Sequence, residues 1–148
     1  MKTHGFLHIT IGVNDLERST AFYRDVVGCE VFRKNPIMTF MSSGDALFVL
    51  TKMPNDYVRP NPPGGPSAPS TLFHHAFLIE PERFDDTIEE FKAKGIEFWD
   101  CREMDHGSFP GRKHVYVHDP DGNAVEFATM LPEEVARARA RAAVASAN

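Results

Sequence analysis

The chain has 148 residues, a length suited to one domain with a core of its own and too short for a second large one. Its hydrophobic content of 42% and charged content of 25% are ordinary for a soluble globular protein, and no apolar run reaches the roughly 18 residues that a membrane span needs. The formal net charge of -5 offers no basic field to a phosphate backbone. We therefore expect a small molecule as the partner, and neither nucleic acid nor a membrane.

The N-terminus and the cysteines indicate the compartment. The first residues enter an alternating pattern without the apolar stretch and cleavage site of a signal peptide, so we expect a cytoplasmic protein. Cys29 and Cys101 are not in a CxxC metal spacing. We expect two buried free thiols, because free cysteine packs as a small hydrophobic residue.

The first half of the chain predicts a strand, a helix and three further strands. Ile9, Ile11 and Val13 alternate with small or polar residues, which is the period of two of a half-buried strand. Asn14-Asp15 then offers a helix N-cap, and Gly28 ends the helical pattern. The expected elements are a strand at 7–13, a helix at 16–27 and strands at 30–33, 38–41 and 46–50.

The same order of elements repeats after a stretch rich in proline, glycine and serine at residues 55–70, which predicts a linker. The repeat is a strand at 73–79, a helix at 81–94 and strands at 96–99, 114–118 and 124–129. A duplicated unit has a sheet face that one copy cannot bury alone. We therefore predict an α+β domain over residues 1–130, in which two βαβββ modules form a curved mixed sheet around a metal site. The modules cover about 5–53 and 72–130, the linker about 54–71, and a C-terminal helix or tail 131–148.

A histidine opens the first strand of each module, at His8 and His74. His75 is the rival of His74, but alternation would place it on the same face as the large apolar Phe77. In the last strand, alternation places Glu126 on the side opposite the core. Two imidazoles and one carboxylate are the ligands of non-haem Fe(II) oxygenases, and they also suit Mn²⁺ or Zn²⁺. We predict His8, His74 and Glu126 as metal ligands, with His75 as an alternative to His74.

Two segments resemble a known superfamily. Residues 7–19, with Phe22-Tyr23 and Val27-Gly28, resemble the opening of vicinal-oxygen-chelate proteins, and the sequence DPDGNAVEF at 119–127 resembles their closing. The likeness covers about residues 6–130. The superfamily includes glyoxalase I, fosfomycin-resistance enzymes, methylmalonyl-CoA epimerase and extradiol ring-cleavage dioxygenases. It implies paired βαβββ modules around one metal, with the modules pairing within a chain or across a homodimer, and a homodimer as the expected assembly.

The branch of the superfamily is indicated by further residues. Glyoxalase I enzymes take another metal-binding glutamate from the fourth strand of the first module, where this chain has Val49. The segment Asp105-His106-Gly107, followed by Tyr116, looks like the extradiol dioxygenase signature. That likeness implies His106 and Tyr116 as catalytic residues that handle protons and bind a substrate oxygen.

Two further observations bear on the extradiol branch: one adds candidate residues, and the other argues against ring cleavage. His114 and His118 alternate in register with Tyr116, so they are reserve candidates for the same face. Extradiol enzymes usually carry another acid-base histidine near the start of the first module's fourth strand, where this chain has Ser43-Gly44-Asp45.

The resulting prediction is an Fe(II)-dependent extradiol-type dioxygenase, an oxidoreductase that cleaves a small aromatic diol. One alternative is a glyoxalase-like lyase, isomerase or thiol-transferase that uses Mn²⁺, Ni²⁺ or Zn²⁺ to polarise an oxygen. Another is a metal-free protein that sequesters a bulky small molecule. The identity of the bound metal distinguishes these hypotheses.

Overall fold

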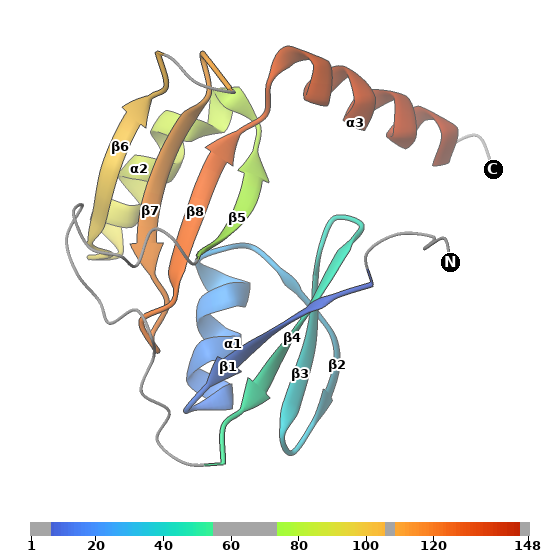
Figure 1. Ribbon diagram of the computed structural model, residues 1–148, viewed down its shortest axis with the longest axis vertical. Helices are drawn as coiled ribbons and strands as arrows, with labels where there is room; N and C mark the ends of the chain where they lie inside the picture. Colours follow the sequence, from blue (N-terminus) through green and yellow to red (C-terminus); the bar gives the residue numbers. More distant parts are fainter. Residues whose placement is uncertain (1–6, 55–73, 106–108, 146–148) are drawn as a thin grey trace. The chain divides into compact units, whose positions relative to one another are not determined.

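The structure, a computed structural model, describes residues 7–54, 74–105 and 109–145, so the predicted linker at 55–70 lies outside the described residues. The chain divides into two compact units, which are coloured along the sequence in Figure 1. The first unit comprises Met1–Pro63 and Asp119–Asn123, and the second comprises Gly64–His118 and Ala124–Asn148. Each unit contains one four-stranded sheet.

The sheet of the first unit has the order β1-β4-β3-β2, with β1 parallel to β4 and the other neighbours antiparallel. Helix α1 begins at the N-cap Asp15, whose side chain accepts a hydrogen bond from the backbone amide of Arg18. Tyr23 of α1 packs on Phe48 of β4 with ring centroids 5.3 Å apart, so α1 covers the sheet face that Phe48 shares with buried Leu50. The elements are β1 (Ile9–Val13), α1 (Leu16–Asp25), β2 (Glu30–Asn35), β3 (Met38–Ser43) and β4 (Ala46–Lys52).

The second unit repeats this arrangement with the strand order β5-β8-β7-β6, in which β5 is parallel to β8. Helix α2 lies behind the sheet in Figure 1, and its buried Phe91 packs on Phe127 of β8 with ring centroids 5.1 Å apart. The elements are β5 (His74–Ile79), η2 (Pro81–Arg83), α2 (Phe84–Ala93), β6 (Phe98–Glu103), β7 (Lys113–His118), β8 (Ala124–Thr129) and α3 (Pro132–Ala145).

The predicted fold class, α+β with two βαβββ modules, is confirmed. The boundaries of β6 differ from those predicted, because the strand runs from Phe98 to Glu103 instead of ending at Trp99. A register irregularity between Trp99 and Arg102 lets the strand continue its pairing with β7 beyond that point. No described helix has the length and apolar character needed to cross a membrane.

The two cysteines are both free, but only one is buried. Cys29 is 3% exposed, and burial raises the pKa of its thiol to about 12. Cys101 is exposed, so the prediction that both thiols are buried is wrong for Cys101. The reason is the extension of β6, which carries Cys101 on a strand at the edge of the sheet.

This difference predicts one reactive thiol per folded chain. We expect a disulfide reagent such as DTNB to modify Cys101 in the native protein and Cys29 only after unfolding, since the thiolate is the attacking species. Counting the thiolate released before and after adding denaturant measures this, and Cys101→Ser is expected to abolish the native-state reaction. Two equally fast thiols in the native protein would contradict the burial of Cys29.

The C-terminal helix α3 is fixed to the second unit at its first turn. The Glu134 carboxylate accepts a hydrogen bond from the Leu131 backbone amide at 2.8 Å. It also accepts from Nη2 of Arg112, at 2.9 and 2.8 Å to its two oxygens. These contacts tie the start of α3 to the loop that precedes β7.

The anchor of α3 is expected to depend on pH. The hydrogen bond from Leu131 and the guanidinium of Arg112 lower the pKa of Glu134, so the docked state favours the carboxylate. Its contribution to stability is therefore present above the ordinary glutamate pKa and is lost as the pH falls through the lowered value. We expect the hydrogen-exchange protection factor of the Leu131 amide to fall on acidification, and to be low already at neutral pH in Glu134→Gln. Equal protection in the variant and the wild type would contradict this role.

Candidate metal site

One face of the second unit's sheet collects the polar residues expected at the site. Glu126 of β8 lies opposite Ala76 of β5, so His74, two residues before Ala76, shares its face. His75 lies one residue out of phase and stacks edge-on against Phe77, with ring centroids 5.8 Å apart. The register thus places His74, and not His75, beside Glu126. We call this side of the sheet the site face.

The two predicted ligands of the second module are in contact. Nε2 of His74 lies 2.9 Å from Oε2 of Glu126, and Nδ1 of His114 lies 3.8 Å from the other carboxylate oxygen. The Glu126 side chain is 13% exposed. Burial alone would raise the pKa of Glu126, but the hydrogen bond and charge of His74, with His114 and the Tyr116 hydroxyl, lower it below its ordinary value. Glu126 is therefore held as a carboxylate, the form that binds a metal.

Tyr116 lies at the centre of the site face. It is opposite Glu126 in the β7–β8 pairing, and its hydroxyl donates a hydrogen bond to the Glu126 carboxylate. Its ring packs edge-on against His74 at 5.4 Å and lies 5.5 Å from the ring of His114. Burial, followed by the charge of Glu126, raises the pKa of Tyr116 to about 12. Tyr116 therefore keeps its proton at neutral pH and orients the carboxylate.

The other predicted site residues are not part of this group. His8 belongs to the first unit, where it is exposed directly before β1, and His106 lies outside the described residues. Across residues 7–54, 74–105 and 109–145, no three His, Cys, Asp or Glu side chains gather closely enough to hold a metal ion. His74 and Glu126 nevertheless fit a divalent metal, because an imidazole nitrogen and a carboxylate oxygen are both suitable donors and lie together. His8 as a third ligand stays a prediction.

Three functional candidates extend the site face towards β6. His114 and His118, the reserve residues, do share this face with Tyr116, and the ring of His118 stacks on Trp99 at 4.1 Å. Sequence reasoning missed Asp100, whose carboxylate lies 3.5 Å from Nε2 of His114. No sequence signal marks Asp100, because its position depends on the irregularity in β6.

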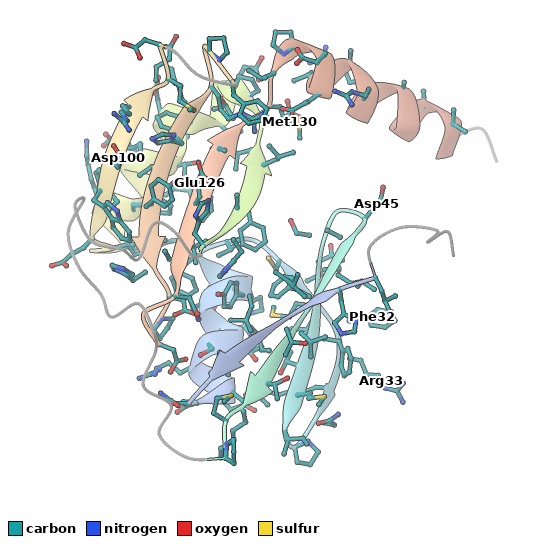
Figure 2. All side chains as sticks on the ribbon, in the orientation of Figure 1. Phe32, Arg33, Asp45, Asp100, Glu126 and Met130 are labelled. Carbon is teal, nitrogen blue, oxygen red and sulfur yellow. The ribbon has the colours of Figure 1, made fainter. Side chains whose placement is uncertain are left out.

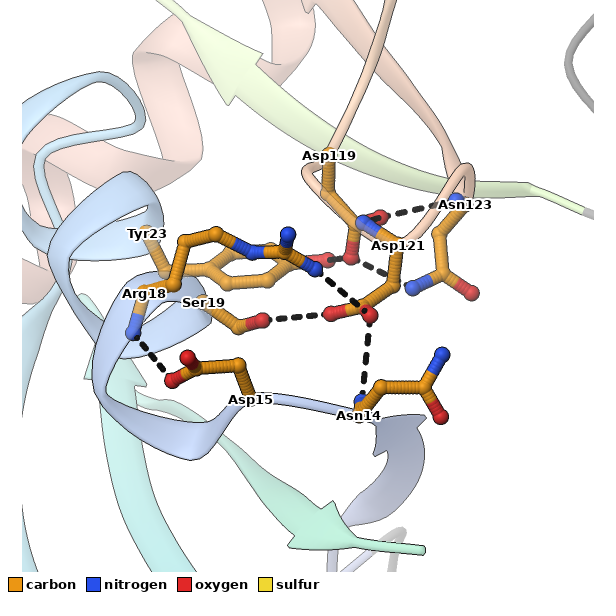
Figure 3. A network of polar contacts seen from close by, with 8 residues as sticks. All are labelled: Asn14, Asp15, Arg18, Ser19, Tyr23, Asp119, Asp121 and Asn123. Atoms are coloured by element: carbon orange, nitrogen blue, oxygen red, sulfur yellow. Dashed lines mark hydrogen bonds and ion pairs between the residues drawn. The ribbon is translucent and has the colours of Figure 1, made fainter. Parts of the chain in front are cut away.

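The turn that leads into β8 is held in the first unit by two aspartates, as Figure 3 shows. The Asp121 carboxylate accepts hydrogen bonds from the Asn14 backbone amide, from Nη2 of Arg18, and from the Ser19 hydroxyl at 2.6 Å. The Asp119 carboxylate accepts a hydrogen bond from the Tyr23 hydroxyl, and it also accepts hydrogen bonds from Asp121 and Asn123 within the turn. These contacts fix the turn to α1 and to Asn14, which precedes the helix.

Residues 5–127 match the family described as the Glyoxalase/Bleomycin resistance protein/Dioxygenase superfamily. The chain belongs to this superfamily. The fosfomycin resistance protein FosX of Listeria monocytogenes is 30% identical over 130 residues, which cover 88% of this chain and 92% of FosX. A solved structure of FosX superposes with a TM-score of 0.70 at 24% identity, covering 90% of this chain and 98% of that one, and shows the same fold.

Two further relatives in the superfamily are named as transferases. The glutathione transferase FosA of Serratia marcescens is 25% identical over 121 residues, covering 81% of this chain and 77% of FosA. The metallothiol transferase FosB of Lysinibacillus sphaericus is 26% identical over 129 residues, covering 87% of this chain and 84% of FosB. The predicted resemblance to the superfamily is thus confirmed.

The prediction of an extradiol dioxygenase is wrong. The relatives are resistance proteins and thiol transferases, which support neither ring cleavage nor an oxidoreductase. They support a divalent metal but not Fe(II). The error has a physical cause, because two histidines and a carboxylate suit several metals and therefore do not specify a reaction. The relatives favour the thiol-transferase alternative.

Proposed function

We propose that the chain is a divalent-metal-dependent enzyme that transfers a thiol to a small molecule. His74 and Glu126 are two of its metal ligands, and His8 is the third. The observation that carries the proposal is the contact of 2.9 Å between His74 and Glu126 on one sheet face, in a chain whose relatives include a metallothiol transferase and a glutathione transferase. A cytoplasmic location and a homodimer belong to the same proposal.

The reaction requires few groups from the chain. A divalent metal supplies a Lewis acid that polarises an oxygen of the electrophilic substrate. A bond forms between the thiol sulfur and a substrate carbon, the carbon–oxygen bond breaks, and the thiol proton ends on the released oxygen. Tyr116 holds the Glu126 carboxylate in place through its hydroxyl, and the buried ring of His114 packs against the ring of Tyr116.

Metal-dependent turnover tests the proposal. The metal-free protein is reconstituted separately with Mn²⁺, Mg²⁺, Zn²⁺ and Ni²⁺ and supplied with fosfomycin, a small epoxide, plus glutathione or L-cysteine. We expect at least one metal to support equal losses of fosfomycin, followed by phosphorus NMR, and of free thiol. Glu126→Gln is expected to abolish both losses.

The outcomes separate the possible reactions. Loss of fosfomycin without loss of thiol would replace thiol transfer by addition of water. If the metal-loaded protein consumes neither compound with any of these metals and thiols, thiol transfer to this epoxide fails as the proposed function.

A further inference from the structure

An irregularity in β6 turns a charged side chain onto the site face. Trp99 lies opposite Tyr116, and Arg102 lies opposite His114. Tyr116 and His114 are two residues apart and share a face, whereas Trp99 and Arg102 are three apart and would lie on opposite faces of a regular strand. The extra residue therefore brings Arg102 to the site face. Asp100, within the irregularity, has a φ of 51° and is the only residue other than glycine with a positive φ among the described residues.

The irregularity in β6 changes which side chains of the strand lie on the site face. Bulges concentrate next to active sites, where they redirect a side chain, and a positive φ outside glycine is sparsely populated. Figure 2 labels Asp100 on β6 and Glu126 on β8 of the same sheet. The irregularity interrupts the regular pairing of β6 with β7, and it places Arg102 on the site face.

The guanidinium of Arg102 is held on its inner side and open on its outer side. Its Nε lies 3.0 Å from Oδ1 of Asp100 and 3.5 Å from Nε2 of His114, and Nη2 lies 3.5 Å from Oδ2 of Asp100. The His114 side chain is 6% exposed and that of Asp100 27%, whereas the Arg102 side chain is 63% exposed. Two more deeply buried side chains thus contact an arginine whose own side chain is mostly exposed. Such preorganisation reduces the entropy lost when a ligand binds.

The charge distribution on the site face favours binding of the anionic end of a ligand at Arg102. In the described strands of this sheet, Arg102 is the only lysine or arginine on the face of Glu126. Arg102 is on β6 and Glu126 is on β8, two strands away, and Arg102 is level with Ala128, two residues beyond Glu126. With about 4.8 Å between neighbouring strands and about 3.4 Å per residue, the backbones of Arg102 and Glu126 are separated by roughly 12 Å. A small molecule whose reacting end lies at Glu126 can therefore reach Arg102 with its other end.

We propose that Arg102 recognises an anionic oxygen group of a substrate, with Asp100 and His114 as the residues that position its guanidinium. This rests on the proposed function, because the reacting end of that substrate lies at His74 and Glu126. The chemistry required is a carboxylate or phosphonate that accepts hydrogen bonds from the outer edge of the guanidinium. The group belongs either to the electrophilic substrate or to the thiol, since a glutathione-type thiol also carries carboxylates.

Binding of two non-reacting probes tests the proposal. Methylphosphonate stands for the electrophile and S-methylglutathione for the thiol, and their affinities are measured by calorimetry on the Mn²⁺-loaded protein. The variants are Arg102→Gln, which removes the charge, Arg102→Lys, which keeps it, and the matched control Arg83→Gln at an arginine that is 56% exposed. The affinity for Mn²⁺ is measured separately for each protein by electron paramagnetic resonance of the free ion.

We expect Arg102→Gln to weaken at least one probe about tenfold or more, as for the loss of a charge-assisted hydrogen bond, while Mn²⁺ affinity is unchanged. Arg102→Lys should retain more affinity than Arg102→Gln, and Arg83→Gln should bind as the wild type does. The probe that is weakened identifies which substrate carries the anion. The proposal is overturned if Arg102→Gln binds both probes normally, if Arg83→Gln loses as much affinity, or if the wild type binds neither probe.

The failure of this proposal is distinguishable from failure of the proposed function. Normal Mn²⁺ binding and thiol turnover with no effect at Arg102 would refute anion recognition alone. Probe binding that depends on Arg102, without metal binding or turnover, would refute the metal-dependent thiol transfer alone.

Discussion

Replacing His74 with alanine or Glu126 with glutamine is expected to lower the affinity for Mn²⁺ by more than about 100-fold, since changes in groups that merely support a metal ligand already cost 10–100-fold. The reason is the contact between the two side chains. Nε2 of His74 and Oε2 of Glu126 lie 2.9 Å apart, so each substitution removes one of two adjoining donors. Titration of Mn²⁺, with the free ion followed by electron paramagnetic resonance, measures the loss.

The chain offers a matched control for each substitution. His75→Ala makes the same change one residue along, on the opposite face, where the ring packs against Phe77. Glu103→Gln removes the same charge from an exposed position at the end of β6. Both controls are expected to bind Mn²⁺ as the wild type does, because neither changes a donor beside the His74–Glu126 pair.

The same titration decides the role of the first module. His8→Ala is expected to lose Mn²⁺ affinity to a similar extent if His8 is the third ligand. If His75→Ala lost Mn²⁺ affinity and His74→Ala did not, the assignment of His74 as the ligand from strand register would be contradicted. Full affinity in both His74→Ala and Glu126→Gln would remove the metal site from this sheet face altogether.

The choice between His74 and His75 shows what alternation in a sequence can predict. A strand has a side-chain period of two, so placing Phe77 in the core fixes every other residue of β5, and the structure has this phase. The same reasoning fails in β6. The irregularity between Trp99 and Arg102 breaks the period without a glycine or proline to mark it, so neither Asp100 nor Arg102 could be assigned to the site face from sequence.

The sequence predicted the wrong reaction. The likeness of His106 and Tyr116 to the extradiol signature implied proton transfer on an aromatic diol, but such residue types and spacing do not distinguish substrates. Ser43-Gly44-Asp45, where extradiol enzymes usually carry a histidine, was the one local signal against ring cleavage. Chemistry at such a site depends on which molecule the surrounding loops admit, and that information is not contained in a strand pattern.

Long-range polar contacts could not be predicted from the sequence either. The composition of residues 119–123 predicts a turn, since aspartate, proline, glycine and asparagine favour turns. It does not reveal that Asp121 meets the backbone amide of Asn14, 107 residues earlier. The side chain of Asp121 is nevertheless fully buried there, which makes it a major structural residue of the first unit.

Replacing Asp121 with alanine is expected to lower the free energy of unfolding by about 3 kcal/mol, the order found when one partner of a buried charged network is removed. The variant leaves the Asn14 amide and the Ser19 hydroxyl without their acceptor, and Ser19 is 0% exposed. It also removes the anion opposite Arg18, which contributes less because that side chain is 52% exposed. Urea denaturation followed by circular dichroism measures the loss.

Two variants identify the cause of the expected destabilisation. Asp25→Ala makes the same change in an ion pair with Arg24 whose side chains are both more than half exposed, so it is expected to change stability little. Asp121→Asn keeps a carbonyl acceptor for the Asn14 amide but loses the charge, and an intermediate stability is expected. If Asp121→Ala is no less stable than Asp25→Ala, the buried hydrogen bonds of the turn do not stabilise the first unit. A stability of Asp121→Asn equal to that of Asp121→Ala would instead assign the effect to the charge opposite Arg18.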